Sequence, residues 1–200
     1  MLKVGLTGGI GSGKSMVSKI IEAMGYSVFN SDEQAKELSD AHPKIRQALI
    51  KLLGDEVYIE SSLNRPFLAS KIFNDKSLLQ KVNEIIHPRV RLAFQNFSKK
   101  NNKELVFNEA AILIETGAHE NFDKMILVTA PEEVRINRVM NRDKCSRDEV
   151  LQRLSKQWTD DKKKDFADII INNDGVTPLV KQVEEAIDYL SSSQGSKSSS

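Results

Sequence analysis

A glycine-rich segment near the N-terminus restricts the fold of this chain more than any other feature of its sequence. Residues 8–15 read GGIGSGKS and match the phosphate-binding pattern G-x-x-x-x-G-K-[ST]. The apolar run before them, residues 2–7, predicts a strand, and apolar residues at helical spacing after them predict a helix that ends near Gly25. Strand, loop and helix in this order are the context in which the pattern cradles a nucleotide phosphate.

Each residue type in this phosphate-binding loop (P-loop) suits a triphosphate. Glycines let successive N–H groups turn toward one phosphate, and the following helix N-terminus adds positive potential. Lys14 is expected to reach the β- and γ-phosphates of ATP, and the Ser15 hydroxyl to coordinate Mg²⁺. A glycine-rich turn that merely joins a strand to a helix would not need this Lys–Ser pair. The residues expected to bind ATP here are Gly9, Ile10, Gly11, Ser12, Gly13, Lys14, Ser15 and Met16.

The rest of the chain alternates strands with helices. Apolar segments predict strands at residues 26–29, 104–108, 124–129 and 168–172, and no further strong strand is expected within 31–100. Such alternation is typical of an α/β protein in which helices cover both faces of a parallel sheet. We therefore expect the three-layer P-loop fold with a mostly five-stranded parallel sheet, whose ligands bind at the carboxyl ends of the strands.

Local signals set several helix ends. Ser31 or Asp32 is expected to cap the helix after the second strand, and His87-Pro88 to interrupt a helix that resumes at Val90. Ser146 has the capping-box spacing to Glu149, which predicts a helix over about 146–158. Two more helices are predicted at 131–140 and 178–190.

Composition limits the partners and the compartment. Lys plus Arg total 29 against 28 Asp plus Glu, so a net charge of +1 gives no reason to expect nucleic acid or a membrane surface. Cys145 is the single cysteine, so no intrachain disulfide forms. The sequence enters a strand at once, without a leader, and no apolar run approaches the length of a membrane span. The expected location is the cytoplasm.

Missing motifs narrow the class of nucleotide-binding protein. The chain has no Asn-Lys-x-Asp guanine motif and no Asp-x-x-Gly switch, which favours a small-molecule kinase over a GTPase. Such a kinase needs a carboxylate to align the acceptor hydroxyl and take its proton, and Asp32 follows the second strand where this role requires. Glu109, at the end of the third strand, is a candidate to hold a Mg²⁺-bound water, although a plain strand-end carboxylate explains it nearly as well.

Arginines and lysines cluster between residues 135 and 164. Arg138 and Arg142 lie one turn apart on the same helix face, a spacing that fits a lid as well as a solvated face. We expect the lid role, in which both arginines close over the transferring phosphoryl group and Arg142 also contacts ATP. A solvated helix face suffices to explain Arg135 and Arg147. The run of residues 162–164, three lysines flanked by aspartates, is most simply a solvated turn.

We expect these parts to form one P-loop kinase domain over residues 1–190. Its core takes residues 1–30, 104–134 and 165–190, a helical acceptor insert takes about 31–103, and a helical lid takes about 135–164. The serine-rich tail, residues 191–200, is expected to be disordered because it has little apolar surface to bury.

Over residues 6–183 the chain resembles the dephospho-coenzyme A kinases. The P-loop is close to the form of that family, and further motifs follow in the same order. They are Asp32, Leu63-Asn64-Arg65 with Leu68 and Phe73, Ile86-His87-Pro88, Ile112-Leu113-Ile114-Glu115, Pro131 with Arg138 and Arg142, Arg153 with Gln157, and Ala167-Asp168 leading to Asn173 and Gly175. The resemblance implies that ATP phosphorylates the ribose 3′-hydroxyl of dephospho-coenzyme A, the last step of coenzyme A synthesis.

The resemblance also implies parts for individual residues. Arg65, His87 and Glu115 are expected to bind the coenzyme A precursor, and Asn173 and Gly175 to border the adenine of ATP. A monomer or a small homo-oligomer is expected. Three departures from the family pattern stand out: Asn30 replaces the first acid of Asp-x-Asp, Ala111 replaces the proline of Pro-Leu-Leu-Phe-Glu, and Met16 replaces a frequent threonine.

Two alternatives stay open at this level. A kinase for shikimate or a nucleoside monophosphate would share the loop and lid, although the long helical insert with His87-Pro88 disfavours the shikimate type. A nucleotide-responsive binding protein without catalytic activity would bind ATP but show no acceptor-dependent turnover. The arginine pair and the acceptor-side Asp32 favour an enzyme.

Overall fold

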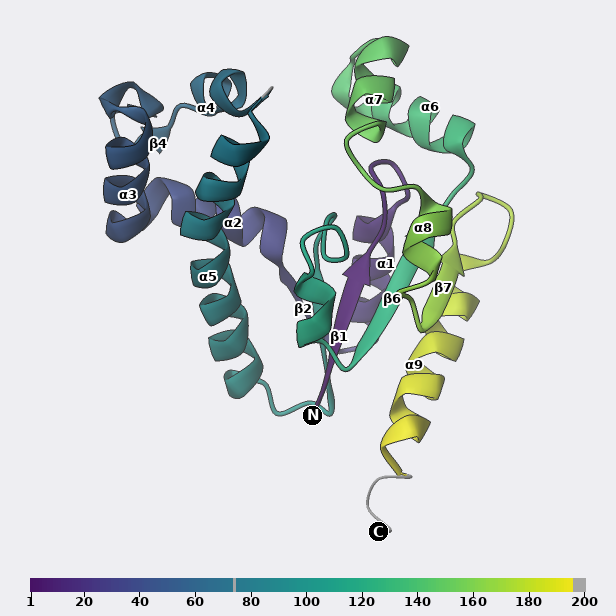
Figure 1. Ribbon diagram of the computed structural model, residues 1–200. Coiled ribbons are helices and arrows are strands. Elements are labelled where there is room, and N and C mark those ends of the chain that lie inside the picture. The colour runs from purple at the N-terminus through teal and green to yellow at the C-terminus, as the bar shows by residue number, and fades with distance from the viewer. Residues whose placement is uncertain (74, 196–200) are drawn as a thin grey trace. The chain divides into compact units, whose positions relative to one another are not determined.

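The computed structural model of the chain describes residues 1–73 and 75–195. The backbone divides into two compact units, of which the first combines Met1–Phe29 with Asn101–Ser200 and the second comprises Asn30–Lys100 (Figure 1). The second unit is continuous in sequence, whereas the first is assembled from both ends of the chain. In the part of the chain that the structure describes, no helix is both long and apolar enough to span a bilayer.

A five-stranded sheet with the order β2-β5-β1-β6-β7 forms the centre of the first unit. β1 pairs in parallel with β5 and β6, and β6 pairs in parallel with β7. The strands are β1 (Leu2–Thr7), β2 (Ser27–Asn30), β5 (Leu105–Glu109), β6 (Lys124–Thr129) and β7 (Ile169–Asn172). The predicted α/β fold and all five predicted strands are confirmed, with ends shifted by at most a residue or so.

The two faces of this sheet are covered differently. Helices α1 (Lys14–Ala23) and α9 (Leu179–Gly195) pack on one face, where they enclose Val4 and Leu6 of β1 in the main apolar core. Between these two residues, Gly5 points to the opposite face, toward Met125. That face is covered by the turns after β5, the short helix η2 (Ala118–Asn121) and α8 (Asp160–Lys164). The result is the predicted three-layer arrangement.

Two further helices of the first unit, α6 (Glu132–Asp143) and α7 (Arg147–Leu154), lie with α8 in the segment predicted to be a lid, about 135–164. They share a small core of Ile136, Val139 and Val150. The predicted capping box at α7 is confirmed, because the Ser146 hydroxyl accepts from the Glu149 N–H while the Glu149 carboxylate accepts from the Ser146 N–H.

The second unit is mainly helical and has its own core. Its elements are α2 (Ser31–Ala41), α3 (Pro43–Leu53), η1 (Asp55–Val57), β3 (Tyr58–Ile59), β4 (Ser62–Leu63), α4 (Arg65–Ile72) and α5 (Lys76–Lys100). Ile45, Leu49 and Val57 are almost fully buried at its centre. β3 and β4 form a two-stranded antiparallel hairpin that was not expected from the sequence, because two-residue strands are too short to show a period of two.

Several predicted helix ends were wrong. Asn30, rather than Ser31 or Asp32, caps α2, since its side chain accepts a hydrogen bond from the Glu33 N–H. α5 runs unbroken through Pro88. Burial of Val90 stabilises the helix beyond the proline and offsets the backbone hydrogen bond that Pro88 cannot donate. α9 continues to Gly195, so helix replaces the disorder predicted for 191–195, and residues 196–200 lie outside the described residues.

Candidate active site

The P-loop connects β1 to α1 in the first unit. Gly13 precedes the helix with φ of 94°, a conformation that favours glycine, and a Cβ atom there would overlap Nδ2 of Asn173. Among the described residues, no side chain caps this helix end. The Lys14 ammonium folds back over the loop and donates to the Gly8 carbonyl at 2.9 Å. The loop therefore presents a helix N-terminus and a lysine to the same place, a combination that attracts phosphate.

A buried carboxylate lies beside the first turn of α1. The Ser15 hydroxyl lies 3.4 Å from Oε1 of Glu109, and the Ser18 hydroxyl donates to Oε2 at 2.7 Å. Glu109 is 6% exposed and ends β5, whose register places it opposite Leu6 of β1. The two residues predicted at the metal site are thus brought together.

The donor set at Ser15 suits Mg²⁺. The described residues contain no group of three or more His, Cys, Asp or Glu that would hold a metal by themselves. Mg²⁺ commonly takes one or two protein oxygens and fills its octahedron with phosphate oxygens and water. One hydroxyl next to a buried carboxylate fits this mode, with Glu109 available to accept from a metal-bound water.

Arg138 reaches the P-loop from α6. Its Nη1 donates to the carbonyls of Gly11 and Ser12, each at 3.5 Å, and its Nη2 donates to Oδ1 of Asn173 at 3.2 Å. The amide of Asn173 in turn donates to the Ser12 carbonyl at 2.9 Å. A guanidinium from α6 and an amide from the end of β7 therefore meet at the loop predicted to bind ATP.

Arg142 has a different environment from Arg138. Its side chain is 64% exposed and donates to Asp143 at 2.7 Å, and Arg153 binds the other side of the same carboxylate. The hydrogen bond from Arg142 lowers the pKa of Asp143, and Arg153 adds to the effect. The structure thus brings one of the two predicted lid arginines to the P-loop and leaves the other in an exposed ion-pair cluster.

The residues predicted to serve the acceptor lie in the second unit, apart from Glu115. Asp32 lies in the first turn of α2. Burial, and to a lesser extent Arg91, lower the pKa of His87, while Asp32 acts in the opposite direction. Arg65 forms an ion pair with Asp40 at 2.8 Å and keeps the pKa of that carboxyl low through this hydrogen bond. Asp32 therefore acts electrostatically on His87 within one unit.

Comparisons with known proteins decide the family. A family model described as dephospho-CoA kinase matches residues 2–178. The chain belongs to the dephospho-CoA kinase family. A dephospho-CoA kinase of Bacteroides fragilis is 41% identical over 190 residues, which cover 94% of this chain and 93% of that protein.

Solved structures agree with this assignment. A crystal structure of a Thermus thermophilus protein superposes with a TM-score of 0.83 at 31% identity, covering 96% of this chain and 97% of that one. A dephospho-CoA kinase from Campylobacter jejuni superposes with a TM-score of 0.67 at 26% identity, covering 96% and 98%. The predicted family, fold and enzyme class are confirmed. As a dephospho-CoA kinase, the chain is a phosphotransferase that uses ATP to phosphorylate dephospho-CoA in coenzyme A biosynthesis.

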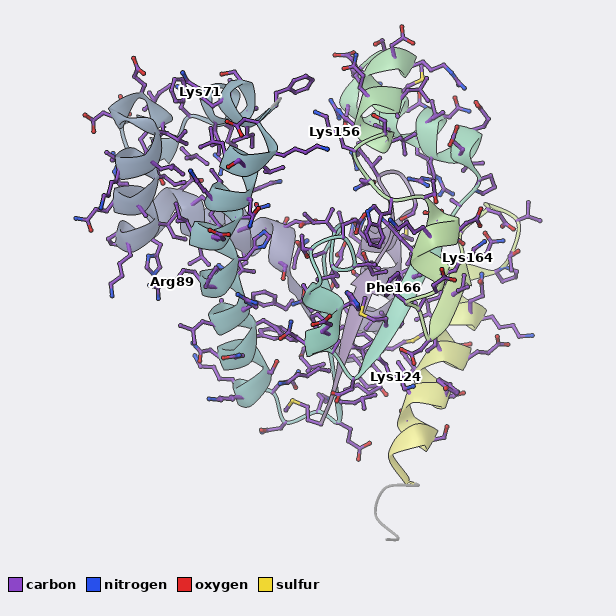
Figure 2. All side chains as sticks on the ribbon, in the orientation of Figure 1. Lys71, Arg89, Lys124, Lys156, Lys164 and Phe166 are labelled. Carbon is purple, nitrogen blue, oxygen red and sulfur yellow. The ribbon has the colours of Figure 1, made fainter. Side chains whose placement is uncertain are left out.

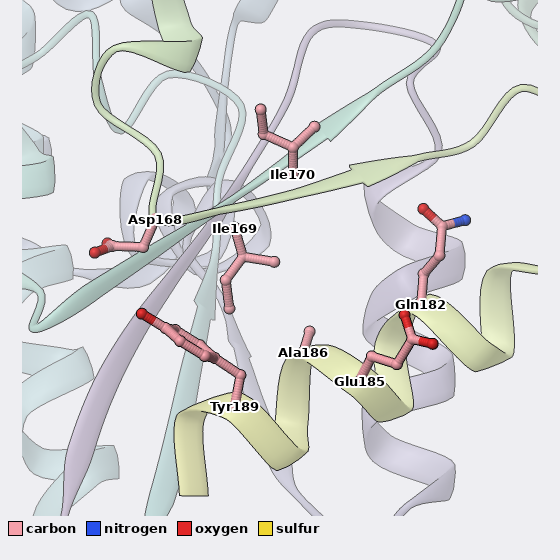
Figure 3. A pocket seen from close by; sticks show the side chains of 7 residues that line it. All are labelled: Asp168, Ile169, Ile170, Gln182, Glu185, Ala186 and Tyr189. Carbon is pink, nitrogen blue, oxygen red and sulfur yellow. The ribbon is translucent and has the colours of Figure 1, made fainter. Parts of the chain in front are cut away.

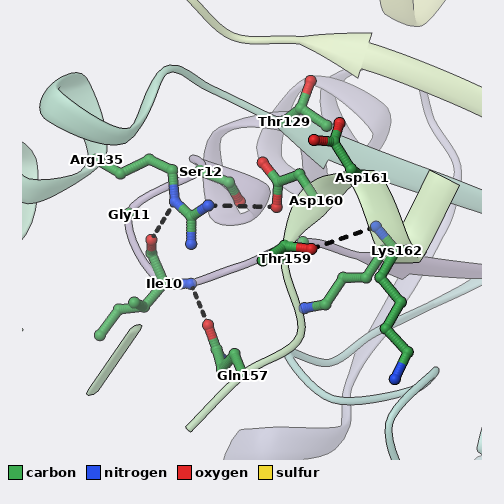
Figure 4. A network of polar contacts seen from close by, with 12 residues as sticks. Ile10, Gly11, Ser12, Thr129, Arg135, Gln157, Thr159, Asp160, Asp161 and Lys162 are labelled. Atoms are coloured by element: carbon green, nitrogen blue, oxygen red, sulfur yellow. Dashed lines mark hydrogen bonds and ion pairs between the residues drawn. The ribbon is translucent and has the colours of Figure 1, made fainter. Parts of the chain in front are cut away.

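The prediction that Arg135 lies on a solvated face was wrong. Arg135 is 7% exposed; its Nε donates to the Ile10 carbonyl at 3.0 Å, and its Nη1 pairs with Asp160 at 3.2 Å (Figure 4). From the other side, Oε1 of Gln157 accepts from the Ile10 N–H at 2.8 Å. Gln157 appeared in the sequence only as one position of the family resemblance, and nothing in the spacing of Arg135 distinguished it from an exposed arginine.

The lysine run at 162–164 is also not a uniformly solvated turn. Lys164, labelled in Figure 2, is exposed and pairs with Asp161, whereas Lys163 is 0% exposed and lies 2.7 Å from Oε1 of Glu115. The contact is an ion pair without the alignment of a hydrogen bond. Glu115, predicted to bind substrate, is thus held by a buried lysine of the same unit, and its substrate role stays a prediction.

A shallow hollow of about 320 Å³ lies away from the P-loop, between β7 and α9 (Figure 3). Asp168, one of its lining residues, pairs with Lys124 and accepts from the Met125 N–H, so this carboxylate ties β7 to β6.

Gly175 lies in the loop from β7 to α9, where Asp174 accepts from the N–H groups of Val176 and Thr177. This loop is therefore ordered by its own hydrogen bonds next to Asn173.

Proposed function

We propose that this dephospho-CoA kinase transfers the γ-phosphoryl group of Mg-ATP to the ribose 3′-hydroxyl of dephospho-CoA and releases coenzyme A and ADP, the last step of coenzyme A synthesis. The observation that carries the donor half is the meeting of Lys14, Arg138 and Asn173 on one glycine-rich loop. Phosphoryl transfer needs this kind of positioning and charge more than covalent chemistry.

On the donor side, the backbone N–H groups of residues 9–16 and the Lys14 ammonium bind the phosphates. Arg138 stabilises negative charge on the transferring phosphoryl group from its place beside the loop. Arg142 joins it once it exchanges Asp143 for phosphate, an exchange that its exposed position permits. Asn173 and Gly175 border the adenine.

Ser15 supplies the protein ligand for Mg²⁺, and Glu109 orients a water in the coordination shell of the metal. When bound, Mg²⁺ neutralises charge on the β- and γ-phosphates. The Ser18 hydroxyl donates to Glu109, which keeps this buried carboxylate aimed at Ser15.

On the acceptor side, Asp32 aligns the ribose 3′-hydroxyl and accepts its proton as the new P–O bond forms. Asp32 is not needed as a helix cap, because Asn30 caps α2. Arg65, His87 and Glu115 bind the coenzyme A precursor. Arg65 is the natural partner for a phosphate of that precursor because its side chain, although paired with Asp40, is 44% exposed.

The activity itself is tested by incubating the protein with Mg-ATP and dephospho-CoA and measuring ADP and coenzyme A. ADP formation should depend on dephospho-CoA, and shikimate or a nucleoside monophosphate should not replace it. Well-folded protein that shows no acceptor-dependent turnover would contradict the proposal.

The role of Asp32 has a sharper test. Asp32→Asn should lower kcat by roughly 10²- to 10⁴-fold, because the proton acceptor is lost, while the Kd for ATP stays unchanged. Glu37→Gln, which neutralises an exposed acid on the same helix, is the matched control and should keep full turnover. Unchanged turnover in Asp32→Asn would remove Asp32 from catalysis.

We also propose that the enzyme works in the cytoplasm as a monomer or small homo-oligomer, without nucleic acid. The near-balanced net charge of +1 and the lone Cys145 support this proposal. Sedimentation equilibrium at micromolar concentration would establish the oligomeric state, and a species above a tetramer would argue against it.

A further inference from the structure

We propose that Arg135 is a positioning residue of the kinase, which sets the conformation of the P-loop through Ile10. Arg135, Gln157 and Asp160 together hold Ile10 in place, and we call these three residues the clamp. The inference deepens the proposed function because it concerns the same ATP site. Arg135 and Gln157 lie far from Ile10 in sequence and come from two sides of the lid segment, one within α6 and one after α7.

Both backbone polar groups of Ile10, the N–H and the carbonyl, are hydrogen-bonded to side chains. Its carbonyl accepts from Nε of Arg135 at 3.0 Å, and its N–H donates to Oε1 of Gln157 at 2.8 Å (Figure 4). Its side chain packs against the core of Ile136, Val139 and Val150 that α6 and α7 share. Ile10 lies two residues before Ser12, so its orientation fixes how the following N–H groups turn toward phosphate.

The guanidinium of Arg135 is itself fixed. Its side chain is 9% exposed, and the carboxylate of Asp160, whose side chain is 17% exposed, pairs with it at 3.2 Å. The P-loop is shaped around this group, since a Cβ atom on Gly9 would overlap the guanidinium. A buried arginine with one carboxylate and one carbonyl partner keeps a single orientation, which a flexible surface arginine does not.

The clamp is anchored beyond Asp160. Asp160 opens α8, and Lys163 of the same short helix is buried against Glu115 in the turns after β5. α8 therefore joins two ion pairs, one toward the P-loop and one toward those turns. Through this helix, the position of Ile10 depends on residues that do not touch the loop.

Arg135 and Arg138 of α6 therefore have different roles. Arg135 binds the P-loop at Ile10 through a buried ion-paired guanidinium, whereas Arg138, one turn later, lies against the loop at Gly11 and Ser12 with longer contacts of 3.5 Å. Long contacts are readily exchanged for a phosphate oxygen, and short buried ones are not. Arg135 thus prepares the site before ATP arrives and does not contact the reacting atoms.

The test compares Arg135→Ala, Arg135→Gln and Asp160→Asn with Arg147→Ala. Arg147 pairs with Glu133 on the exposed side of α6 and α7. Arg147→Ala is therefore the matched control, because it removes one arginine charge from the lid as Arg135→Ala does. Arg135→Ala should raise the Kd and KM for ATP by about ten-fold or more, the worth of a charge-assisted hydrogen bond, with the KM for dephospho-CoA within about two-fold of wild type. Arg135→Gln, which can still donate to Ile10, should recover part of the loss. Arg147→Ala should behave as wild type.

Amide hydrogen exchange of the ligand-free protein supplies a readout that needs no turnover. The Ile10 N–H should exchange faster in Arg135→Ala and in Asp160→Asn than in wild type, and combining the two substitutions should add little, because both act through one ion pair. Unchanged exchange at Ile10 together with an unchanged KM for ATP would overturn the proposal. If Arg135→Ala does not fold, the same two measurements on Asp160→Asn decide the question. The activity of the wild-type enzyme tests the proposed function separately.

Discussion

Gly13 shows how a single residue can limit the P-loop. Its φ of 94° disfavours any side chain, and the space where a Cβ atom would stand is filled by the amide of Asn173. Gly25, after the same helix, also has a positive φ, of 86°, but a Cβ atom at this position would have no neighbour within 4 Å. A substitution at Gly25 would therefore cause backbone strain alone, whereas one at Gly13 would cause strain and steric overlap together.

Gly13→Ala should cost more than the roughly 1 kcal/mol expected from backbone strain alone, because Asn173 must also move away from the Ser12 carbonyl. We expect weaker ATP binding together with a lower free energy of unfolding in urea. Gly25→Ala is the control, and it should lower stability by about 1 kcal/mol without changing the Kd for ATP. Equal effects of the two substitutions would show that Asn173 adds no constraint.

At the residue scale, the local structure around the P-loop followed the prediction, because a strand precedes it and a helix begins at Lys14, while the roles of Lys14 and Ser15 in binding ATP and Mg²⁺ stay predictions. Lys14 and Ser15 were predicted because a short pattern contains all the groups that the loop needs. Arg135 and Lys163 were misjudged because the burial of a charge depends on partners distant in sequence, Ile10 and Glu115. Spacing along one helix does not reveal which side of it another segment will cover.

Among the elements, α8 is short but joins two parts of the first unit. Lys163 is fully buried, and Glu115 is 11% exposed, so each needs the charge of the other. Glu115 lies in the turns at residues 111–117 that follow β5, and the pair therefore fixes these turns against the helix. The strands themselves were predictable from short apolar runs, whereas this link between a turn and a five-residue helix leaves no periodic pattern.

Glu115→Gln should lower the free energy of unfolding by about 3–5 kcal/mol, because it leaves the Lys163 charge buried without a counter-charge. The double variant Glu115→Leu with Lys163→Met should recover most of this loss, since it removes both charges and keeps their volume. Urea unfolding measures both effects. A loss below about 1 kcal/mol in Glu115→Gln would contradict the buried ion pair, and a raised KM for dephospho-CoA in the stable double variant would support the predicted substrate role of Glu115.

On the scale of the whole molecule, the chain divides into two units with separate cores. The predicted insert at about 31–103 and the observed second unit, Asn30–Lys100, have similar limits because the strand pattern stops after β2 and resumes at β5. The assignment of acceptor binding to this unit remains a prediction. Its hairpin and the unbroken course of α5 through Pro88 depend on packing within the unit, which local signals do not contain.

The stability of the molecule should depend on pH through His87. Burial lowers the pKa of His87 below its ordinary value near 6.5, so the unfolded chain binds the proton more readily than the native protein. The free energy of unfolding should therefore rise with pH through this window and fall as pH drops below about 6.5. Urea unfolding of wild type and His87→Gln at about pH 5.5, 6.5 and 7.5 checks this. If both proteins show the same slope, His87 contributes nothing to it.

β1 carries the P-loop yet lies between β5 and β6, and the Ser12 carbonyl accepts a hydrogen bond from Asn173, 161 positions later. A ribosome adds about 5–20 residues per second and delivers the N-terminal part first. β1 must therefore wait for partners that are made much later, while the continuous second unit has all of its own residues. We expect nascent chains to gain protection by ATP only after Asn173 has left the ribosome, so the nucleotide would distinguish chains that have completed β7 from shorter ones.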